Sequence, residues 1–511
     1  MANFTRFASF FLVAFCLPCD AQIEPPGTER DRLTYAELQK DETTIDDSVH
    51  TGYFMPVGNV AAALQDLSAT LIIPETEGWS FGTFPGVSVQ MFSSGDRLIP
   101  VTRSIIRADN PRHWNITFSP GRVWSEPTDN GLSRASFPFV LTKKWPDAAH
   151  HGLATFLFDE KMVSPLVFQI TSKNYTSMAW GRLQISLLHG EVKYRDLVEA
   201  EHSLEIEQRL PIRPLGELAT AFGNRGQVAL RNWPDIEDES VSGVLIDGVL
   251  YVGDCPTRFG PYPYCDEMRH SVYSMSKSLD NLIAMLRLAH KYGDQVFELK
   301  IQDYVDTVNE GTFADALNMT IGEKFNYSDA VADLLGVAMD RFLKSLEGSD
   351  ADIWDMVLEE VLKPIGVFHS PIVPTDERAG YDGVPVLREG IFPTYHDIAK
   401  IALLLQHGGQ FGGEQILSEG KIREALYQTK KRGAPAPNSN NAGVSYYMSL
   451  WQVPIKLDEC TVNVSMMSGV GGKIAVLLPS GTVAFYVRNS RGTNYVKELT
   501  IVANSLSPEC Q

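Results

Sequence analysis

The chain has 511 residues, of which 44% are hydrophobic and 21% are charged, a composition typical of folded globular proteins. Its 44 lysines and arginines against 63 aspartates and glutamates leave a formal net charge of −19 at pH 7. This acidity disfavours nucleic acid or an anionic membrane surface as a partner. Since the length exceeds that of one ordinary domain, we expect two domains.

The N-terminus predicts a secretory signal peptide over residues 1–21. Arg6 supplies a positive charge, and residues 7–17 form an apolar stretch that is too short to span a bilayer. Small residues follow, so we expect cleavage after Ala21. Cys19 raises the alternative of a lipoprotein anchor, although the two residues before it fit that signal poorly. We therefore expect a secreted or periplasmic protein with no integral membrane span after signal removal.

Four cysteines remain beyond the signal peptide, and an even number in an exported protein allows two disulfide bonds. A bond between Cys255 and Cys265 would close a short loop rich in proline and aromatic residues. A bond between Cys460 and Cys510 would tie the C-terminus to a late strand. Because four cysteines allow three connectivities, the sequence leaves the pairing open. No spacing typical of metal ligands occurs, so we expect no metal site.

Residues 22–50 are polar and charged and predict a flexible lead-in. Residues 51–211 contain short strand-like runs separated by glycine, proline and Asn-Gly, which predict a β-rich, sandwich-like N-terminal domain of unknown role. In a strand, His150 and His151 would point to opposite faces and make a poor pair of metal ligands, so we expect them at the surface or in a turn. The clearest strand-like runs are 69–73, 87–92, 137–141 and 166–170.

Beyond residue 212, strands come first, helices follow and strands return at the end of the chain. This order predicts an α+β domain over 212–511, an antiparallel sheet flanked by helices. Asp247-Gly248 predicts the turn of a first hairpin. The last two strands, 473–478 and 482–487, are expected to form a hairpin at the edge of the sheet. Helices are expected from near Ser274, over 330–343 and 352–362, and through 398–406 after a cap at Thr394.

Ser274 and Lys277 lie one helical turn apart if a helix begins near Ser274, as the apolar spacing of the following residues predicts. A serine hydroxyl is a weak nucleophile until a neighbour removes its proton, and a partly desolvated lysine can do so. The N-terminus of the helix would add N–H groups where an oxyanion forms. Alone the motif is weak, because a capping serine followed by a solvated lysine gives the same pattern.

Two further motifs follow in the chain. Residues 325–329 (FNYSD) place a tyrosine before a predicted helix, and a tyrosine near a lysine can serve as a general base. Residues 467–472 (MSGVGG) lead into a late strand, where glycines allow close approach of a ligand and an edge strand offers free N–H groups. Without the first motif, they would be read as a buried aromatic residue and a glycine-rich turn.

The order of these three motifs resembles the serine β-lactamase and penicillin-binding-protein-like superfamily. It is most similar to the branch of class C β-lactamases, related esterases and 6-aminohexanoate-dimer hydrolase. The resemblance covers about 212–511 and includes helical segments at 354–366 and 397–409. It implies a β-lactamase-like fold and a hydrolase that cleaves an ester or amide through an acyl-serine intermediate. The substrate would be a small or short peptide-like molecule, and no cofactor is implied.

By this resemblance Ser274 is the nucleophile, and Lys277 accepts or tunes its proton. Tyr327 is the partner base that protonates the leaving group. Backbone N–H groups of Ser274 and Val470 would form the oxyanion hole. The expected substrate contacts are Ser468, Gly469 and Asp329.

Three departures from the family pattern affect the expected substrate. Asp329 replaces the usual asparagine and, when ionised, can only accept hydrogen bonds. Met467 replaces a lysine, so a substrate carboxylate loses its usual cationic partner. The segment from Lys277 to Tyr327 is shorter than usual, which implies a more open pocket or a site that no longer works. We expect a neutral ester or amide as substrate; the alternatives are a β-lactamase or D-Ala-D-Ala-type peptidase, and a catalytically silent binding relative.

Overall fold

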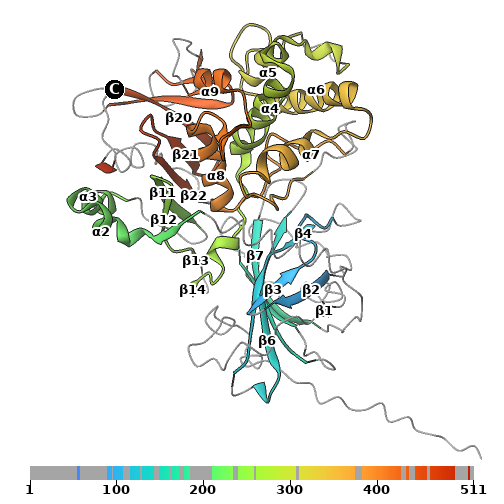
Figure 1. Cartoon of the computed structure of the whole chain (residues 1–511), viewed down its shortest axis with the longest axis vertical. Coiled ribbons are helices and arrows are strands. Elements are labelled where there is room, and N and C mark those ends of the chain that lie inside the picture. The colour runs from blue at the N-terminus through green and yellow to red at the C-terminus, as the bar shows by residue number, and fades with distance from the viewer. Residues whose placement is uncertain are drawn as a thin grey trace, which may run out of the picture.

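In the residues that it describes, the computed structural model contains two large sheets of nine strands each, the second of which is covered by helices (Figure 1). The predicted signal peptide, the lead-in, the run 69–73 and the pair Cys460–Cys510 lie outside the described residues. The structure describes residues 54–57, 89–94, 96–107, 115–126, 129–142, 149–159, 164, 166–171, 178–183, 210–233, 240–257, 260–306, 310–373, 383–426, 433–436, 443–456, 461–488 and 505–506.

The first sheet consists of antiparallel strands in the order β1-β2-β3-β5-β6-β7-β8-β9, with β4 beside β6. It forms the blue to teal part of Figure 1. The expected strand-like runs 87–92, 137–141 and 166–170 fall largely in β2, β6 and β8, while the sandwich-like domain stays a prediction. The bounds are β1 Phe54–Val57, β2 Val89–Ser94, β3 Arg97–Pro100, β4 Asn115–Phe118, β5 Gly121–Trp124, β6 Ser133–Thr142, β7 Ala149–Phe158, β8 Leu166–Thr171 and β9 Met178–Leu183.

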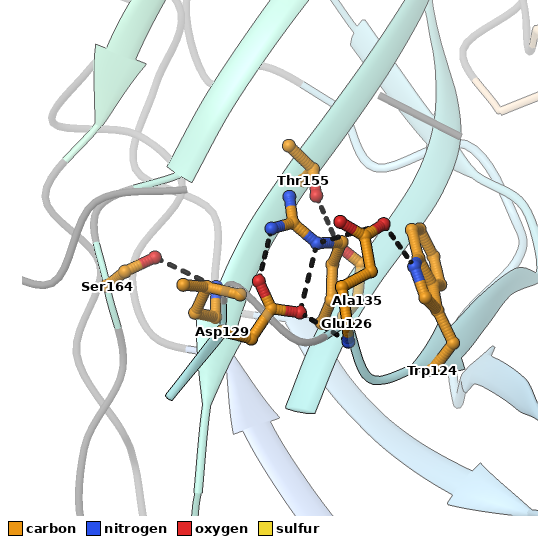
Figure 2. A network of polar contacts seen from close by, with 8 residues as sticks. Trp124, Glu126, Asp129, Ala135, Thr155 and Ser164 are labelled. Carbon is orange, nitrogen blue, oxygen red and sulfur yellow. Dashed lines mark hydrogen bonds and ion pairs between the residues drawn. The ribbon is translucent and has the colours of Figure 1, made fainter. Parts of the chain in front are cut away.

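A buried ion pair fastens the β5–β6 connection to β6 (Figure 2). The Arg134 guanidinium contacts both carboxylate oxygens of Asp129, and these two side chains are 2% and 0% exposed. Asp129 also accepts a hydrogen bond from the backbone N–H of Glu126 at 2.9 Å, and Glu126 accepts one from the Trp124 indole at 2.8 Å. Because a buried charge is tolerated only when it is paired, this network fixes the turn before β6.

The histidine pair departs from the sequence-based expectation. His150 and His151 lie in β7 and are only 2% and 1% exposed, so the prediction of a surface or turn position is wrong. Every residue of β6 and of β7 is buried, which shows that these strands are covered on both faces. Nε2 of His151 lies 2.7 Å from the carbonyl oxygen of Arg269, which accepts the hydrogen bond.

The second sheet has the order β10-β12-β11-β22-β21-β20-β19-β18-β17, and its neighbours are antiparallel except for β10 and β12. The hairpin of β21 and β22 lies in the middle of this sheet, so the prediction of an edge hairpin is wrong. The local sequence predicts the hairpin but not the strands that pair with its two outer edges, β11 and β20. The bounds are β10 Ile212–Pro214, β11 Val241–Ile246, β12 Val249–Val252, β17 Ala434–Pro435, β18 Ser445–Tyr447, β19 Leu450–Lys456, β20 Thr461–Gly469, β21 Lys473–Leu477 and β22 Val483–Val487.

Helices cover both faces of the second sheet. Successive side chains along β21 and β22 point to opposite faces of the sheet. Leu477 and Phe485 pack in one core with helices α4 to α8, and Val476 and Tyr486 pack in another with α2 and α3 (Figure 1). The predicted α+β arrangement, an antiparallel sheet flanked by helices, is confirmed. The helix bounds are α2 Leu218–Phe222, α3 Asn224–Arg231, α4 Leu282–Tyr292, α5 Phe313–Leu317, α6 Asp329–Glu347, α7 Ile353–Val357, α8 Tyr395–Gln406 and α9 Glu419–Ala425.

Local signals account for several of these elements. Asp247 and Gly248 both have positive φ, 50° and 75°, and form the predicted turn between β11 and β12. The side chain of Thr394 accepts a hydrogen bond from the N–H of Asp397, and the Asp397 side chain accepts one in return, which is the expected capping box of α8. None of the helices in the described ranges has both the length and the apolar character needed to cross a bilayer.

Cys255 and Cys265 form a disulfide bond, one of the pairings that the sequence allowed. The short strands β13 (Pro256–Thr257) and β14 (Gly260–Pro261) lie within the loop that it closes. This loop packs on the first sheet, since the Tyr262 hydroxyl donates to the carbonyl oxygen of Gly152 at 2.9 Å. The segment that leads to Ser274 is therefore anchored on β7.

Candidate active site

Ser274 lies in a 3-10 turn, Tyr273–Met275, that is followed by a π-helical turn, Lys277–Asn281, and then by α4. The predicted helical start near Ser274 is confirmed, but its first two turns are not α-helical. A π turn is rare and often marks a functional site. Tyr273 has φ +49°, a left-handed conformation that is strained for a residue with a side chain. The backbone is thus bent sharply just before the serine.

The structure brings Lys277 against Ser274. Nζ of Lys277 donates hydrogen bonds to Oγ of Ser274 at 2.9 Å, to Oδ1 of Asp329 at 2.7 Å and to the carbonyl oxygen of Arg388 at 3.4 Å. Lys277 is fully buried, whereas Ser274 is partly exposed. The buried amino group of Lys277 therefore contacts the hydroxyl of Ser274 from the protein interior, and the hydroxyl remains accessible to a substrate.

Asp329 links Lys277 to a residue that the sequence motifs did not indicate, Arg388. Nη1 of Arg388 lies 3.4 Å from Oδ2 of Asp329, and Nε lies 2.7 Å from Oδ1 of Asp333. Burial raises the pKa of Asp333 to about 6, and the Arg388 guanidinium opposes that shift. Arg388 belongs to no motif, and only its tertiary contacts place it at the site.

Tyr327 contacts Lys277 with the face of its ring and not with its hydroxyl group. The ring centroid is 5.1 Å from Nζ of Lys277, and the ring stacks on Trp451 with a centroid distance of 5.5 Å. Tyr446 contacts the same ring edge-on at 5.5 Å. Within the described residues, the Tyr327 hydroxyl makes no hydrogen bond with Ser274 or Lys277.

The glycine motif ends β20 directly beside the turn that carries Ser274. A Cβ atom on Gly469 would lie 2.0 Å from the carbonyl oxygen of Val272. β19 pairs with β20 only as far as Met466, so Ser468 and Gly469 extend beyond β19 while still pairing with β21. The strand that the motif leads into, β21, was expected at an edge but lies between β20 and β22, and the short projecting end belongs to β20. Val470 follows and is 65% exposed.

Lys473, the first residue of β21, lies beneath the same turn. It is 1% exposed, and its Nζ lies 4.5 Å from the ring centroid of Tyr273. This contact supports the strained residue that precedes Ser274.

We expect Lys473→Met to lower the rate of covalent labelling of Ser274 about 10-fold and the free energy of unfolding by about 1–2 kcal/mol, because a desolvated cation–π contact is lost. Lys421→Met, on helix α9, is the matched control. Nζ of Lys421 also lies 4.5 Å from a ring centroid, that of Phe297. The control should lose similar stability and no reactivity. Equal labelling rates in both variants would contradict a role for Lys473 in positioning the turn.

Asp280 in the π turn is 0% exposed, and neither carboxyl oxygen has a hydrogen-bond partner among the described residues. Burial raises the pKa of Asp280 well above its ordinary value of 3.8. Between the ordinary and the raised pKa, the folded state binds more protons than the unfolded state. The free energy of unfolding contributed by this group therefore falls as pH rises through that window.

We expect Asp280→Asn to gain stability relative to the wild type as pH rises from about 4 towards the raised pKa of Asp280, by about 1.4 kcal/mol for each pH unit of that window. Urea unfolding of both proteins across this range measures the difference. The other titrating groups are present in both proteins and cancel. Parallel pH profiles for the two proteins would show that burial of Asp280 does not perturb its protonation.

Ser274, Lys277, Tyr327 and Asp329 are thus brought together, and Gly469 packs against the turn of Ser274. Within the described ranges, no group of three histidine, cysteine, aspartate or glutamate residues is arranged to hold a metal ion.

The chain matches no protein-family model and no curated protein. It is similar to a solved structure described as a 6-aminohexanoate-dimer hydrolase from Bacillus anthracis, with 16% identity and a TM-score of 0.45 over 60% of this chain and 89% of that one. A family VIII carboxylesterase matches with 14% identity and a TM-score of 0.41 over 58% and 98% of the two chains. A protein described as a β-lactamase from Bacteroides dorei matches with 13% identity and a TM-score of 0.38 over 53% and 94%. The kinds of protein named from the motifs are therefore among the solved structures that this chain is similar to.

Proposed function

We propose that this protein is a serine hydrolase that cleaves an ester or amide through an acyl intermediate on Ser274. The observation that carries the proposal is the hydrogen bond of 2.9 Å from Nζ of the buried Lys277 to Oγ of the partly exposed Ser274. A nucleophile within hydrogen-bond reach of a group that can handle its proton is the basic requirement of covalent catalysis.

In this proposal Ser274 attacks the carbonyl carbon, and its proton passes to Lys277. Tyr327, whose ring centroid lies 5.1 Å from Nζ of Lys277, protonates the leaving group. The N–H groups of Ser274 and Val470 stabilise the oxyanion, a role supported by the close approach of the end of β20 to the turn of Ser274. The proposed substrate contacts are Ser468, Gly469 and Asp329.

The substrate class follows from the charges around the serine. Met467 is fully buried in the core and offers no cation to a substrate carboxylate. Asp329, whose side chain is 50% exposed, instead presents a carboxylate near the nucleophile. We therefore propose a small or short peptide-like substrate whose ester or amide group lacks a neighbouring carboxylate.

We also propose that the hydrolase domain spans 212–511, that a β-rich domain spans 51–211, and that residues 1–21 direct export to the periplasm or the exterior. The disulfide bond between Cys255 and Cys265 supports export, because such bonds persist in oxidising compartments.

Covalent labelling tests the function. The mature protein is treated with a fluorophosphonate probe, its intact mass is measured, and the modified peptide is sequenced by tandem mass spectrometry, with heat-denatured protein as control. We expect one adduct on the native protein, on Ser274. A panel of p-nitrophenyl esters, anilides and nitrocefin then separates esterase, amidase and β-lactamase activity. A folded protein that gains no adduct would refute the proposal.

A further inference from the structure

The hydrogen bonds around Nζ of Lys277 fit an ammonium group. Its Nζ donates to three acceptors, Oγ of Ser274, Oδ1 of Asp329 and the carbonyl oxygen of Arg388. An ammonium group has three N–H donors, whereas a neutral amine has two. A lysine that is already protonated can accept the serine proton only if it passes another proton on.

Two side chains next to Lys277 could take that proton. Tyr327 presents the face of its ring, and within the described residues its hydroxyl has no hydrogen bond to Ser274 or Lys277. Asp329 presents Oδ1 at 2.7 Å from Nζ. We infer that Asp329 is the terminal proton acceptor when Ser274 is activated, and that Arg388 is the positioning residue that orients it. This inference rests on the hydrolase function proposed above.

Every proton is accounted for when Ser274 attacks the carbonyl carbon. As Oγ of Ser274 bonds to the carbonyl carbon, its proton moves to Nζ of Lys277 and another proton moves from Nζ to Oδ1 of Asp329. Lys277 stays charged, Asp329 becomes neutral, and the negative charge appears on the carbonyl oxygen. When the bond to the leaving group breaks, the leaving group gains one proton from the Lys277–Tyr327 pair. Asp329 then returns its proton to Nζ, and water repeats the sequence on the acyl-serine.

Arg388 determines which oxygen of Asp329 faces the lysine. Its side chain is 7% exposed, and its Nη1 lies 3.4 Å from Oδ2 of Asp329, the oxygen that does not contact Lys277. Arg388 is itself held by Asp333, at 2.7 Å from Nε, and by Glu389, at 2.6 Å from Nη2. The half-exposed carboxylate of Asp329 is thus oriented by a buried guanidinium that two other carboxylates fix in place.

The rate of fluorophosphonate labelling of Ser274 tests this inference, because fluoride leaves without a proton and the probe reports activation alone. Asp329→Asn keeps the shape of the side chain and removes the acceptor. We expect the labelling rate to fall about 100-fold or more at about pH 7. The loss should shrink as pH rises, since hydroxide can then take the serine proton. Asp329→Glu should retain more reactivity than Asp329→Asn.

Tyr327→Phe is the discriminating variant, and it should lose less reactivity towards this probe than Asp329→Asn. Arg388→Gln should slow labelling about 10-fold, and Arg388→Lys should restore part of the rate and the pH profile. Asp350→Asn, at the exposed turn after α6, is the control for a lost surface carboxylate. Thermal unfolding of every variant checks that it is folded.

The inference would be overturned if Asp329→Asn is labelled at the wild-type rate. It would also be overturned if Tyr327→Phe is labelled more slowly than Asp329→Asn. Either result leaves the hydrolase proposal intact if the wild type is labelled on Ser274. An unlabelled wild type would instead refute the hydrolase function itself.

Discussion

Ser274→Ala is expected to abolish fluorophosphonate labelling and ester or amide hydrolysis, with a loss of about 10⁴-fold or more, while the protein stays folded. The reason is that, in the proposed mechanism, the hydroxyl oxygen forms the covalent bond, and no other atom of the side chain can replace it. Its side chain contributes one hydrogen bond at a partly exposed position, so the free energy of unfolding should change by about 1 kcal/mol at most. Intact-mass spectrometry and urea unfolding measure both effects.

Ser276→Ala is the matched control. Ser276 lies two residues further along the same turn, is 0% exposed, and has no hydrogen-bond partner for its Oγ among the described residues. It should label at close to the wild-type rate. If Ser274→Ala still gains the adduct, or if Ser276→Ala loses it, the nucleophile is misassigned.

Gly469→Ala is expected to slow labelling of Ser274 about 100-fold and to lower the free energy of unfolding by about 1–3 kcal/mol. The added Cβ would lie 2.0 Å from the carbonyl oxygen of Val272 and 3.2 Å from the backbone nitrogen of Met275. Both atoms belong to the backbone that carries Ser274, so the clash can be relieved only by moving β20 or the turn of Ser274. Labelling kinetics and thermal unfolding measure the two losses.

Gly216→Ala is the control for a glycine substitution in itself. Nothing lies within 4 Å of a Cβ at Gly216, and the residue sits in the short 3-10 helix Leu215–Glu217. We expect an unchanged labelling rate and a gain of about 0.4–1 kcal/mol, because alanine restricts the unfolded chain. A Gly469→Ala protein as reactive as this control would show that the end of β20 does not shape the site.

The sequence by itself determined the features that depend on neighbours in the chain. The capping box at Thr394 and the hairpin turn at Asp247-Gly248 each involve residues only a few positions apart. The disulfide bond between Cys255 and Cys265 was one of the pairings that the sequence left open. The contact of Ser274 with Lys277 belongs to this group, because three residues of helical backbone bring the two side chains together. Local backbone geometry is encoded locally, so these elements could be predicted.

The tertiary structure alone decided the features that join distant segments. The β21–β22 hairpin lies in the middle of the sheet because β11 and β20 flank it, and no local pattern shows that pairing. The burial of His150 and His151 depends on segments far away in the chain, as the 118-residue separation from Arg269 illustrates.

The same distinction explains what was missed at the candidate site. The motif suggested Asp329 as a substrate contact; the structure adds that it pairs with Lys277 across 52 residues, and that the carbonyl oxygen of Arg388 accepts from the same lysine across 111 residues. Tyr327 was identified from its motif, yet stacking on Trp451 sets its orientation. The sequence thus determined the helical turn that joins Ser274 to Lys277 and the types of residues near it. Folding decided which oxygen faces the lysine, because burial and long-range ion pairs depend on where the whole chain places these charges.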